Sequence, residues 1–213
     1  MLLLGHRGAR RYAPENTLSA FDLALEHGCD GFEFDVRLTA DQQCVICHDP
    51  TFSGRTVATS RCDALAPAPS LPDVLEKFAP RAHLDIELKV GGTEAQVAAI
   101  LRQHPPQHGY CVSSFKPEVV EAVHVQDATI PLGLICESQR QFAVWPELPI
   151  KALYLKYSLI TEQVVSDLRA AGKEVFVWTV NDARDMREFA SMGLDGIISD
   201  DSKLLVETLR PKR

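Results

Sequence analysis

The chain has 213 residues, of which 46% are hydrophobic and 24% are charged, proportions typical of a globular protein with one substantial core. Its 29 acidic residues outnumber its 22 lysines and arginines, and the resulting formal charge of -7 argues against nucleic acid or an anionic membrane as a partner. An anionic substrate would therefore have to be held by a local cationic site or by a metal ion.

The first residues and the cysteines indicate the compartment. Only Met1–Leu4 precede Gly5 as an apolar run, fewer than an export signal needs, and no run reaches the length of a membrane span. We therefore expect a cytoplasmic protein with no stable membrane insertion, whose six cysteines are free thiols. The run Cys44-Val45-Ile46-Cys47-His48 fits the haem-attachment pattern, but two cysteines three apart on an extended segment face opposite sides, which argues against haem.

Short apolar runs alternate with amphipathic stretches along the chain, a pattern typical of strand–helix units around a parallel sheet. The predicted strands are Leu2–Gly5, Gly31–Val36, Ala82–Leu88, Tyr110–Ser113, Pro131–Ile135, Ala152–Leu155, Glu174–Thr179 and Gly196–Ser199. The predicted helices are Thr17–Glu26, Leu71–Phe78, Thr93–Arg102, Pro117–Val125, Glu162–Ala171 and Ala183–Ser191. This α/β alternation predicts a TIM-like (β/α)8 barrel, formed by a single domain over residues 1–213.

One segment interrupts the alternation. Gln43–Cys47 is predicted as an extra short strand, and Asp49–Ser70, with three prolines and little periodicity, is predicted as a short loop insertion after the second strand. The competing architecture is an open doubly wound sheet. The first strand–helix turn, Gly5-His6-Arg7-Gly8, lacks the G-x-G-x-x-G spacing of a dinucleotide site, so the closed barrel is favoured.

The active sites of such barrels lie at the carboxyl ends of the strands, so the polar residues there are the candidates. Residues two apart in a strand share a face, so Glu33 and Asp35 point together, and so do Asp85 and Glu87. Buried carboxylates are costly to ionise, and a hard divalent cation, Mg2+ or Ca2+, would compensate them. The alternative is an interior salt-bridge network with the cations Arg37, Arg81 and Lys89.

Two histidines follow predicted strands and adjoin a charged residue. His6 precedes Arg7, and His48 precedes Asp49. Imidazole suits proton transfer near neutral pH, so the two rings are candidate acid and base, while Arg7 and Lys89 are candidates to hold a phosphate. No serine or cysteine paired with a base stands among these residues, so the attacking oxygen is expected to come from water or from the substrate.

Eight short motifs extend from Gly5 almost to the end of the chain. They are Gly5-His6-Arg7-Gly8, Pro14-Glu15-Asn16-Thr17, Gly31-Phe32-Glu33-Phe34-Asp35-Val36, His48-Asp49, Ile86-Glu87-Leu88-Lys89, Ser114-Phe115, Trp178-Thr179-Val180-Asn181 and Gly193-Leu194-Asp195-Gly196-Ile197-Ile198. In this order and at these separations, they resemble the motifs of the glycerophosphodiester phosphodiesterase (GDPD) family. The resemblance implies a TIM-like barrel that hydrolyses glycerophosphodiesters to sn-glycerol 3-phosphate and an alcohol.

The resemblance also implies a role for individual residues. The implied acid and base are His6 and His48. The implied ligands of a divalent cation, Mg2+ or Ca2+, are Glu33, Asp35 and Glu87. The implied substrate-binding residues are Arg7 and Lys89 near the phosphate and Trp178 on the glycerol side. Glu15 and Asn16 are expected mainly to shape the first loop.

The chain departs from the family pattern in two places. The insertion after His48-Asp49 is short, so a small substrate cap is expected, and the usual Thr-Asp-x-Pro near the last strand is here Ser199-Asp200-Asp201-Ser202. The enzymatic alternative is a lipid phosphodiesterase of lysophospholipase D or sphingomyelinase D type, which would need an apolar groove that the short insertion hardly provides. A binding module without turnover is the other alternative, although every acid–base, metal and phosphate position is filled.

Overall fold

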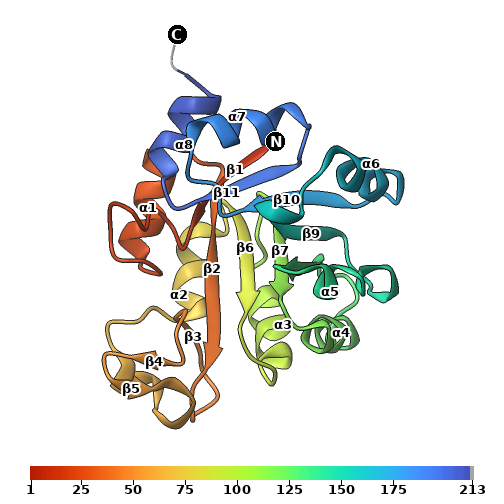
Figure 1. The fold of residues 1–213 in the computed structure, drawn as a ribbon. Coiled ribbons are helices and arrows are strands. Elements are labelled where there is room, and N and C mark those ends of the chain that lie inside the picture. Colours follow the sequence, from red (N-terminus) through yellow and green to blue (C-terminus); the bar gives the residue numbers. More distant parts are fainter. Residues whose placement is uncertain (212–213) are drawn as a thin grey trace.

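The computed structural model describes residues 1–211 and forms a closed barrel of eight parallel strands (Figure 1). In ring order the strands are β1 (Leu2–His6), β2 (Gly31–Leu38), β6 (His83–Leu88), β7 (Tyr110–Ser114), β8 (Leu132–Cys136), β9 (Ala152–Lys156), β10 (Glu174–Trp178) and β11 (Gly196–Ser199). The ring closes because β1 pairs in parallel with both β11 and β2. The predicted barrel and all eight predicted strands are confirmed.

Helices alternate with the strands and cover the outside of the barrel (Figure 1). They are α1 (Leu18–Glu26), α2 (Leu71–Phe78), α3 (Glu94–Gln103), α4 (Pro117–Gln126), α5 (Gln139–Phe142), α6 (Glu162–Ala170), α7 (Ala183–Ser191) and α8 (Ser202–Leu209). Six of these helices were predicted from the sequence, whereas α5 and α8 were not. Helix α8 begins where the Asp201 side chain accepts from the Leu204 amide, and it buries Leu205. No helix in residues 1–211 is both long and apolar enough to cross a bilayer.

Strand β2 shows how the core and the polar interior are built from one sequence. Its alternate residues Phe32 and Phe34 are completely buried against Phe21 of α1 and Phe78 of α2, and the Phe21 and Phe32 rings stack with centroids 4.2 Å apart. The residues between and after them, Glu33 and Asp35, face the other way, into the barrel. The period of two therefore anchors the strand on one face and supplies functional groups on the other.

The insertion after β2 is more ordered than the predicted loop. Strand β3 (Cys44–Ile46) pairs antiparallel with the end of β2, and a small hairpin of β4 (Thr51–Phe52) and β5 (Arg55–Thr56) follows it (Figure 1). The insertion also contains short 3-10 helices at Val57–Thr59 and Cys62–Leu65. Two more 3-10 helices lie outside it, at Trp145–Glu147 and Tyr157–Leu159. The insertion is ordered because it has its own apolar cluster, built from Val45, Cys47, Val57 and Leu65.

Candidate active site

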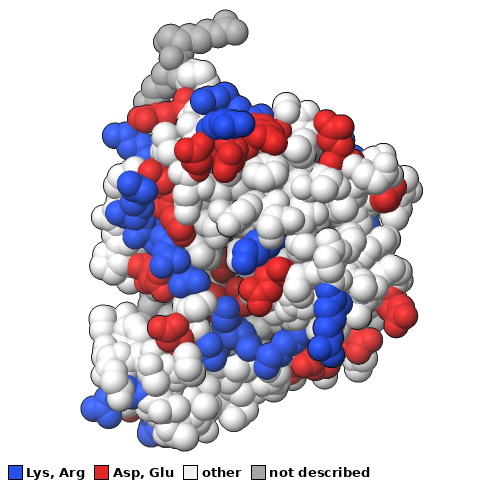
Figure 2. Space-filling model, in the orientation of Figure 1, with Lys and Arg blue, Asp and Glu red and all other residues white. Residues whose placement is uncertain are grey.

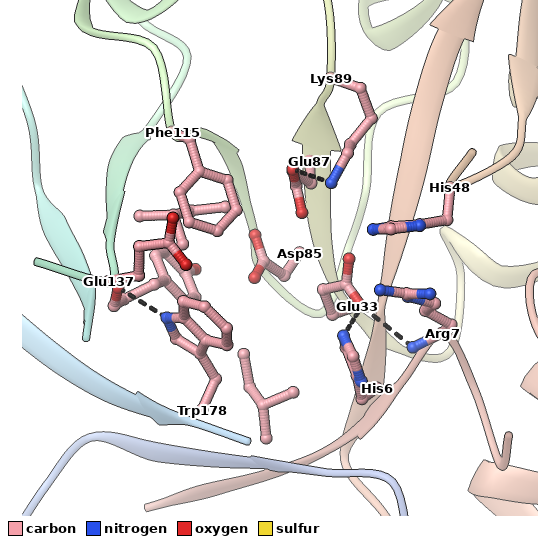
Figure 3. A pocket seen from close by; sticks show the side chains of 13 residues that line it. His6, Arg7, Glu33, His48, Asp85, Glu87, Lys89, Phe115, Glu137 and Trp178 are labelled. Carbon is pink, nitrogen blue, oxygen red and sulfur yellow. Dashed lines mark hydrogen bonds and ion pairs between the residues drawn. The ribbon is translucent and has the colours of Figure 1, made fainter. Parts of the chain in front are cut away.

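A pocket of about 230 Å³ opens at the carboxyl ends of the barrel strands. Figure 2 shows the hollow in this face, bordered by both basic and acidic side chains. Seven of the eight predicted site residues line the pocket, and they are His6, Arg7, Glu33, His48, Glu87, Lys89 and Trp178 (Figure 3). The eighth, Asp35, is fully buried beside them. The barrel thus brings together residues from its first, second, third and seventh strands.

Three carboxylates from two neighbouring strands form the acidic centre of the site. Glu33, Asp35 and Glu87 each offer an oxygen atom within 4.8 Å of the others, and all three are buried. The pairing of β2 with β6 sets Asp35 directly beside Glu87, so the two strands present their acids side by side. Asp85 lies beside Glu33 in the same pairing, and its Oδ1 accepts a hydrogen bond of 2.6 Å from Ser113 Oγ.

Two cations partly neutralise this acidic centre. Arg7 Nε lies 3.2 Å from Asp35 Oδ2, and Lys89 Nζ lies 3.3 Å from Asp35 Oδ1 and 2.6 Å from Glu87 Oε1. Burial acts to raise the pKa of Asp35, but Lys89 and Arg7 outweigh it, so this pKa is below its ordinary value. Of the three cations considered for an interior salt-bridge network, Lys89 does pair with the buried carboxylates. The other two candidate cations are engaged elsewhere, Arg37 with the His48 carbonyl and Arg81 with Asp22.

The remaining carboxylates are left without sufficient compensation. Burial, and next the charge of Asp35, raise the pKa of Glu33 well above its ordinary value, and burial raises the pKa of Glu87 to about 7. Glu33 Oε1 is buried and has no hydrogen-bond partner in residues 1–211. An unpartnered carboxylate oxygen in an all-oxygen cluster is what a hard divalent cation requires, so these residues fit such an ion.

His6 ends β1 and is held between two carboxylates. Its Nε2 lies 3.8 Å from Glu33 Oε2, and its Nδ1 lies 2.6 Å from Asp200 Oδ1. Burial is the largest influence on the His6 pKa and lowers it. A lowered pKa keeps the ring neutral near pH 7, in the form that can accept a proton.

His48 is positioned by the insertion rather than by a barrel strand. It follows β3, its Nδ1 lies 2.7 Å from Asp49 Oδ1, and its carbonyl accepts two hydrogen bonds from the Arg37 guanidinium, from Nε at 2.8 Å and from Nη2 at 2.6 Å. Figure 3 shows the rings of His6 and His48 on either side of Arg7. Each histidine thus has an aspartate at Nδ1 and lies on the charged wall of the pocket.

The conformation of the loop after β1 explains why Arg7 is followed by glycine in the motif Gly5-His6-Arg7-Gly8. Arg7 has a φ of 53° and Gly8 a φ of 80°, which turn the chain so that the Arg7 amide donates to Glu33 Oε2 at 3.0 Å. A Cβ on Gly8 would lie 2.6 Å from the Ala20 carbonyl carbon, so only glycine fits there. The loop therefore places the Arg7 side chain and backbone on two of the three carboxylates.

The opposite wall of the pocket is aromatic. Phe115 and Trp178 meet edge to face with centroids 5.5 Å apart, and Trp178 Nε1 donates to the Tyr154 carbonyl at 2.9 Å (Figure 3). Phe115, from the motif Ser114-Phe115, lines the pocket and was not predicted as a site residue. Glu137, which lines the pocket, and Asp200, which binds His6, were also not predicted as site residues. Both follow a barrel strand, and this position is the signal that could have identified them.

A closed (β/α)8 barrel with an acidic cluster, two histidines and two cations in one pocket belongs to the class of phosphate-handling barrel enzymes. The profile of the Glycerophosphoryl diester phosphodiesterase family matches residues 6–66 and 54–204. The chain belongs to this family. The predicted family and its enzyme class are thereby confirmed.

Similar proteins cover almost the whole length of the chain. A glycerophosphodiester phosphodiesterase of Caldanaerobacter subterraneus subsp. tengcongensis is 27% identical over 98% of each chain. The structure of an Oleispira antarctica phosphodiesterase in complex with the product sn-glycerol-3-phosphate is 25% identical, with a TM-score of 0.88 over 98% of this chain and 96% of that one. A lysophospholipase D of Rattus norvegicus is 22% identical over 97% of this chain and 85% of its own.

Proposed function

We propose that this protein, as a single domain over residues 1–213, hydrolyses glycerophosphodiesters to sn-glycerol 3-phosphate and an alcohol. The observation that carries the proposal is the convergence of His6, His48, Glu33 and Glu87 in one small pocket, with Asp35 buried beside them in the same carboxylate cluster. The product bound to the Oleispira antarctica neighbour supports the substrate class. The substrate is a small molecule that the pocket takes up from solution.

The anionic phosphodiester needs cations in a protein of net charge -7. Arg7 and Lys89 line the pocket and lie on either side of Asp35, so their charges face the substrate from two directions. Glu33, Asp35 and Glu87 would hold a divalent cation, Mg2+ or Ca2+. When bound, such a cation neutralises the phosphate and stabilises charge that develops on its oxygens.

His6 and His48 are proposed as the acid–base pair. As an oxygen attacks phosphorus, the bond from phosphorus to the departing alcohol oxygen breaks, one imidazole takes the proton of the attacking hydroxyl and the other protonates the alcohol. The neutral His6 ring is suited to accept a proton, and His48, more exposed at the pocket edge, has access to either oxygen. Trp178 and Phe115 would contact the carbon skeleton of the glycerol.

Lysophospholipase D activity is the second candidate, and the aromatic wall of Phe115 and Trp178 is the observation that favours it. The pocket volume of about 230 Å³ argues against it. Pockets for larger, drug-sized ligands measure about 300–1,000 Å³. A small polar diester therefore fits better than a lipid with an acyl chain.

The two candidates are separated by one substrate panel. The purified protein is incubated with glycerophosphocholine, glycerophosphoethanolamine, lysophosphatidylcholine and a chromogenic phosphodiester, each with Mg2+, Ca2+ or a chelator. We expect sn-glycerol 3-phosphate from the first two and no turnover with chelator. Turnover of lysophosphatidylcholine alone would replace the proposal by the lipid activity, and no turnover of any substrate would leave a binding module.

A further inference from the structure

The segment after the last barrel strand reaches back to the first one. Asp200 follows β11, and its Oδ1 lies 2.6 Å from Nδ1 of His6 at the end of β1. The two residues are 194 positions apart in the chain and meet only because β1 and β11 pair to close the barrel.

Asp200 is itself held in place by a second side chain. Asn181 Nδ2 donates to Asp200 Oδ2 at 2.7 Å, and Asn181 Oδ1 accepts from the Asp200 amide at 2.9 Å and from Ser199 Oγ at 3.0 Å. Asn181 therefore forms hydrogen bonds with both the backbone and the carboxylate of Asp200. Each oxygen of that carboxylate has its own donor, one in Asn181 and one in His6.

The hydrogen-bond chemistry determines which ring nitrogen of His6 carries the proton. Burial acts to raise the pKa of Asp200, but the bonds from His6 and Asn181 outweigh it, so this pKa is lowered and the group is ionised. An ionised carboxylate only accepts, so Nδ1 of His6 is the donor. Arg10 Nη1 only donates and would favour the opposite tautomer, but it lies farther from Nδ1, at 3.4 Å, and is also 3.5 Å from Asp200 Oδ1, so the shorter bond between Asp200 and Nδ1 decides. Nε2, on the Glu33 side of the ring, is then the nitrogen with the free lone pair (Figure 3).

We propose that Asp200, held by Asn181, is a positioning residue that fixes the tautomer and the orientation of His6, so that Nε2 is presented to the substrate. The inference rests on the proposed acid–base role of His6. It also assigns a role to Asn181, the last residue of the motif Trp178-Thr179-Val180-Asn181, and to Asp200, the first residue after β11.

The test uses the direction in which an amide at position 200 would have to point. In Asp200→Asn the oxygen of the new amide faces Asn181 Nδ2, because that group only donates, and its NH2 therefore faces His6 Nδ1. Nδ1 becomes the acceptor, and the proton moves to Nε2. We expect kcat to fall about 100-fold or more, the scale of losing an acid–base group, with little change in KM.

Two comparisons separate positioning from mere structural support. Asp200→Ala removes the partner of Nδ1 without reversing it, so Asp200→Asn should be at least as damaging, whereas a structural role would make the isosteric Asn the mild variant. Asp201→Asn is the matched control, because this neighbouring carboxylate bonds Tyr12 and caps α8 without touching His6. We expect Asp201→Asn to keep the wild-type kcat.

The tautomer itself is read by NMR on protein labelled with 15N-histidine. The wild type should show His6 protonated on Nδ1, and folded Asp200→Asn should show it protonated on Nε2. An unchanged tautomer, or a kcat of Asp200→Asn within threefold of the wild type, overturns the inference. His6→Ala tests the acid–base role of His6 separately from the positioning role of Asp200. If that variant keeps full activity, the proposed role of His6 is wrong, whatever the effect of changing Asp200.

Discussion

Asn16 and Asp35 exchange two hydrogen bonds between the first loop and β2. Asn16 Nδ2 donates to Asp35 Oδ2 at 2.8 Å, and the Asp35 amide donates to Asn16 Oδ1 at 3.3 Å. Asn16 is buried with a φ of 57°, a left-handed conformation that asparagine tolerates better than most residues. The loop-shaping residue of the sequence analysis thus also holds an oxygen of a candidate metal ligand.

Asn16→Ala is expected to destabilise the fold by about 1–3 kcal/mol, because it removes the hydrogen bond that the buried Asp35 Oδ2 accepts and leaves this oxygen only its ion pair with Arg7. Asn16→Gly loses the same bonds but adopts the positive φ freely, so it should be about 1 kcal/mol more stable than Asn16→Ala. Urea unfolding of the three proteins measures both differences. Equal stability of Asn16→Ala and the wild type would contradict this account.

Metal binding should stabilise the folded protein through the three-carboxylate cluster. A ligand at 100 times its Kd adds about 2.7 kcal/mol to the free energy of unfolding, so Mg2+ or Ca2+ should raise Tm relative to chelator. Glu33→Gln and Glu87→Gln should lose this rise and the activity while remaining folded. Asp85→Asn, a change at a buried acid outside the cluster, should keep the rise. A full rise in Glu33→Gln would remove it from the ligand set.

His6→Ala and His48→Ala should each lower kcat by about 100-fold or more, the usual scale for general acid–base groups. If both serve one proton-transfer path, the double variant should resemble the slower single variant rather than show the product of the two losses. Steady-state kinetics on glycerophosphocholine measures all three. Wild-type activity of His48→Ala would make His48 a structural residue of the insertion.

The origin of the attacking oxygen can be tested with the substrate. The hydroxyl next to the esterified carbon of glycerol is held close to phosphorus, and its attack would form a cyclic phosphate that water then opens, an intramolecular route favoured by proximity. An analogue with hydrogen in place of that hydroxyl should bind but lose kcat. Turnover of the analogue at the rate of glycerophosphocholine would instead establish direct attack by water.

Acid should weaken the contact that ties the end of α8 to the start of β2. Arg210 forms two hydrogen bonds with Asp30, at 2.8 and 2.7 Å, and Asp30 Oδ2 also accepts from the Leu3 amide. Burial acts to raise the pKa of Asp30, but Arg210 and Leu3 outweigh it and lower this pKa. The stabilisation is therefore complete above the unfolded-state pKa, roughly 4, and is lost as pH falls through the folded-state pKa.

The measurement is the difference in unfolding free energy between the wild type and Arg210→Met at a series of pH values. The partly exposed pair should contribute less than about 1 kcal/mol at pH 7, because solvent screens it. The difference should shrink in acid below roughly pH 4. Lys203→Met, at an exposed cation on α8, should show a smaller difference at pH 7. A difference for Arg210→Met that grows in acid would reverse the assigned sign.

The sequence by itself determined the barrel and most of the site. Most of the strands appear in the sequence as apolar runs because they are buried on both faces, and the alternating acids of β2 and β6 stand out against that pattern. Glu33 and Asp35 could be assigned to one face because the strand period is exact over so short a distance. The predicted site residues, from His6 in the first strand to Trp178 in the seventh, could therefore be identified from local sequence patterns together with the family motifs.

Only the tertiary structure decided which partners these residues have. The bond between His6 and Asp200 depends on the closure of β1 against β11, and the neighbours of Asp35 depend on the pairing of β2 with β6. Helix α8 was missed because, within residues 1–211, no strand follows it to mark its end, and the insertion was read as a loop because its apolar cluster forms between residues without periodicity. Local sequence reports which face a side chain occupies, whereas the pairing of distant strands decides what that face meets.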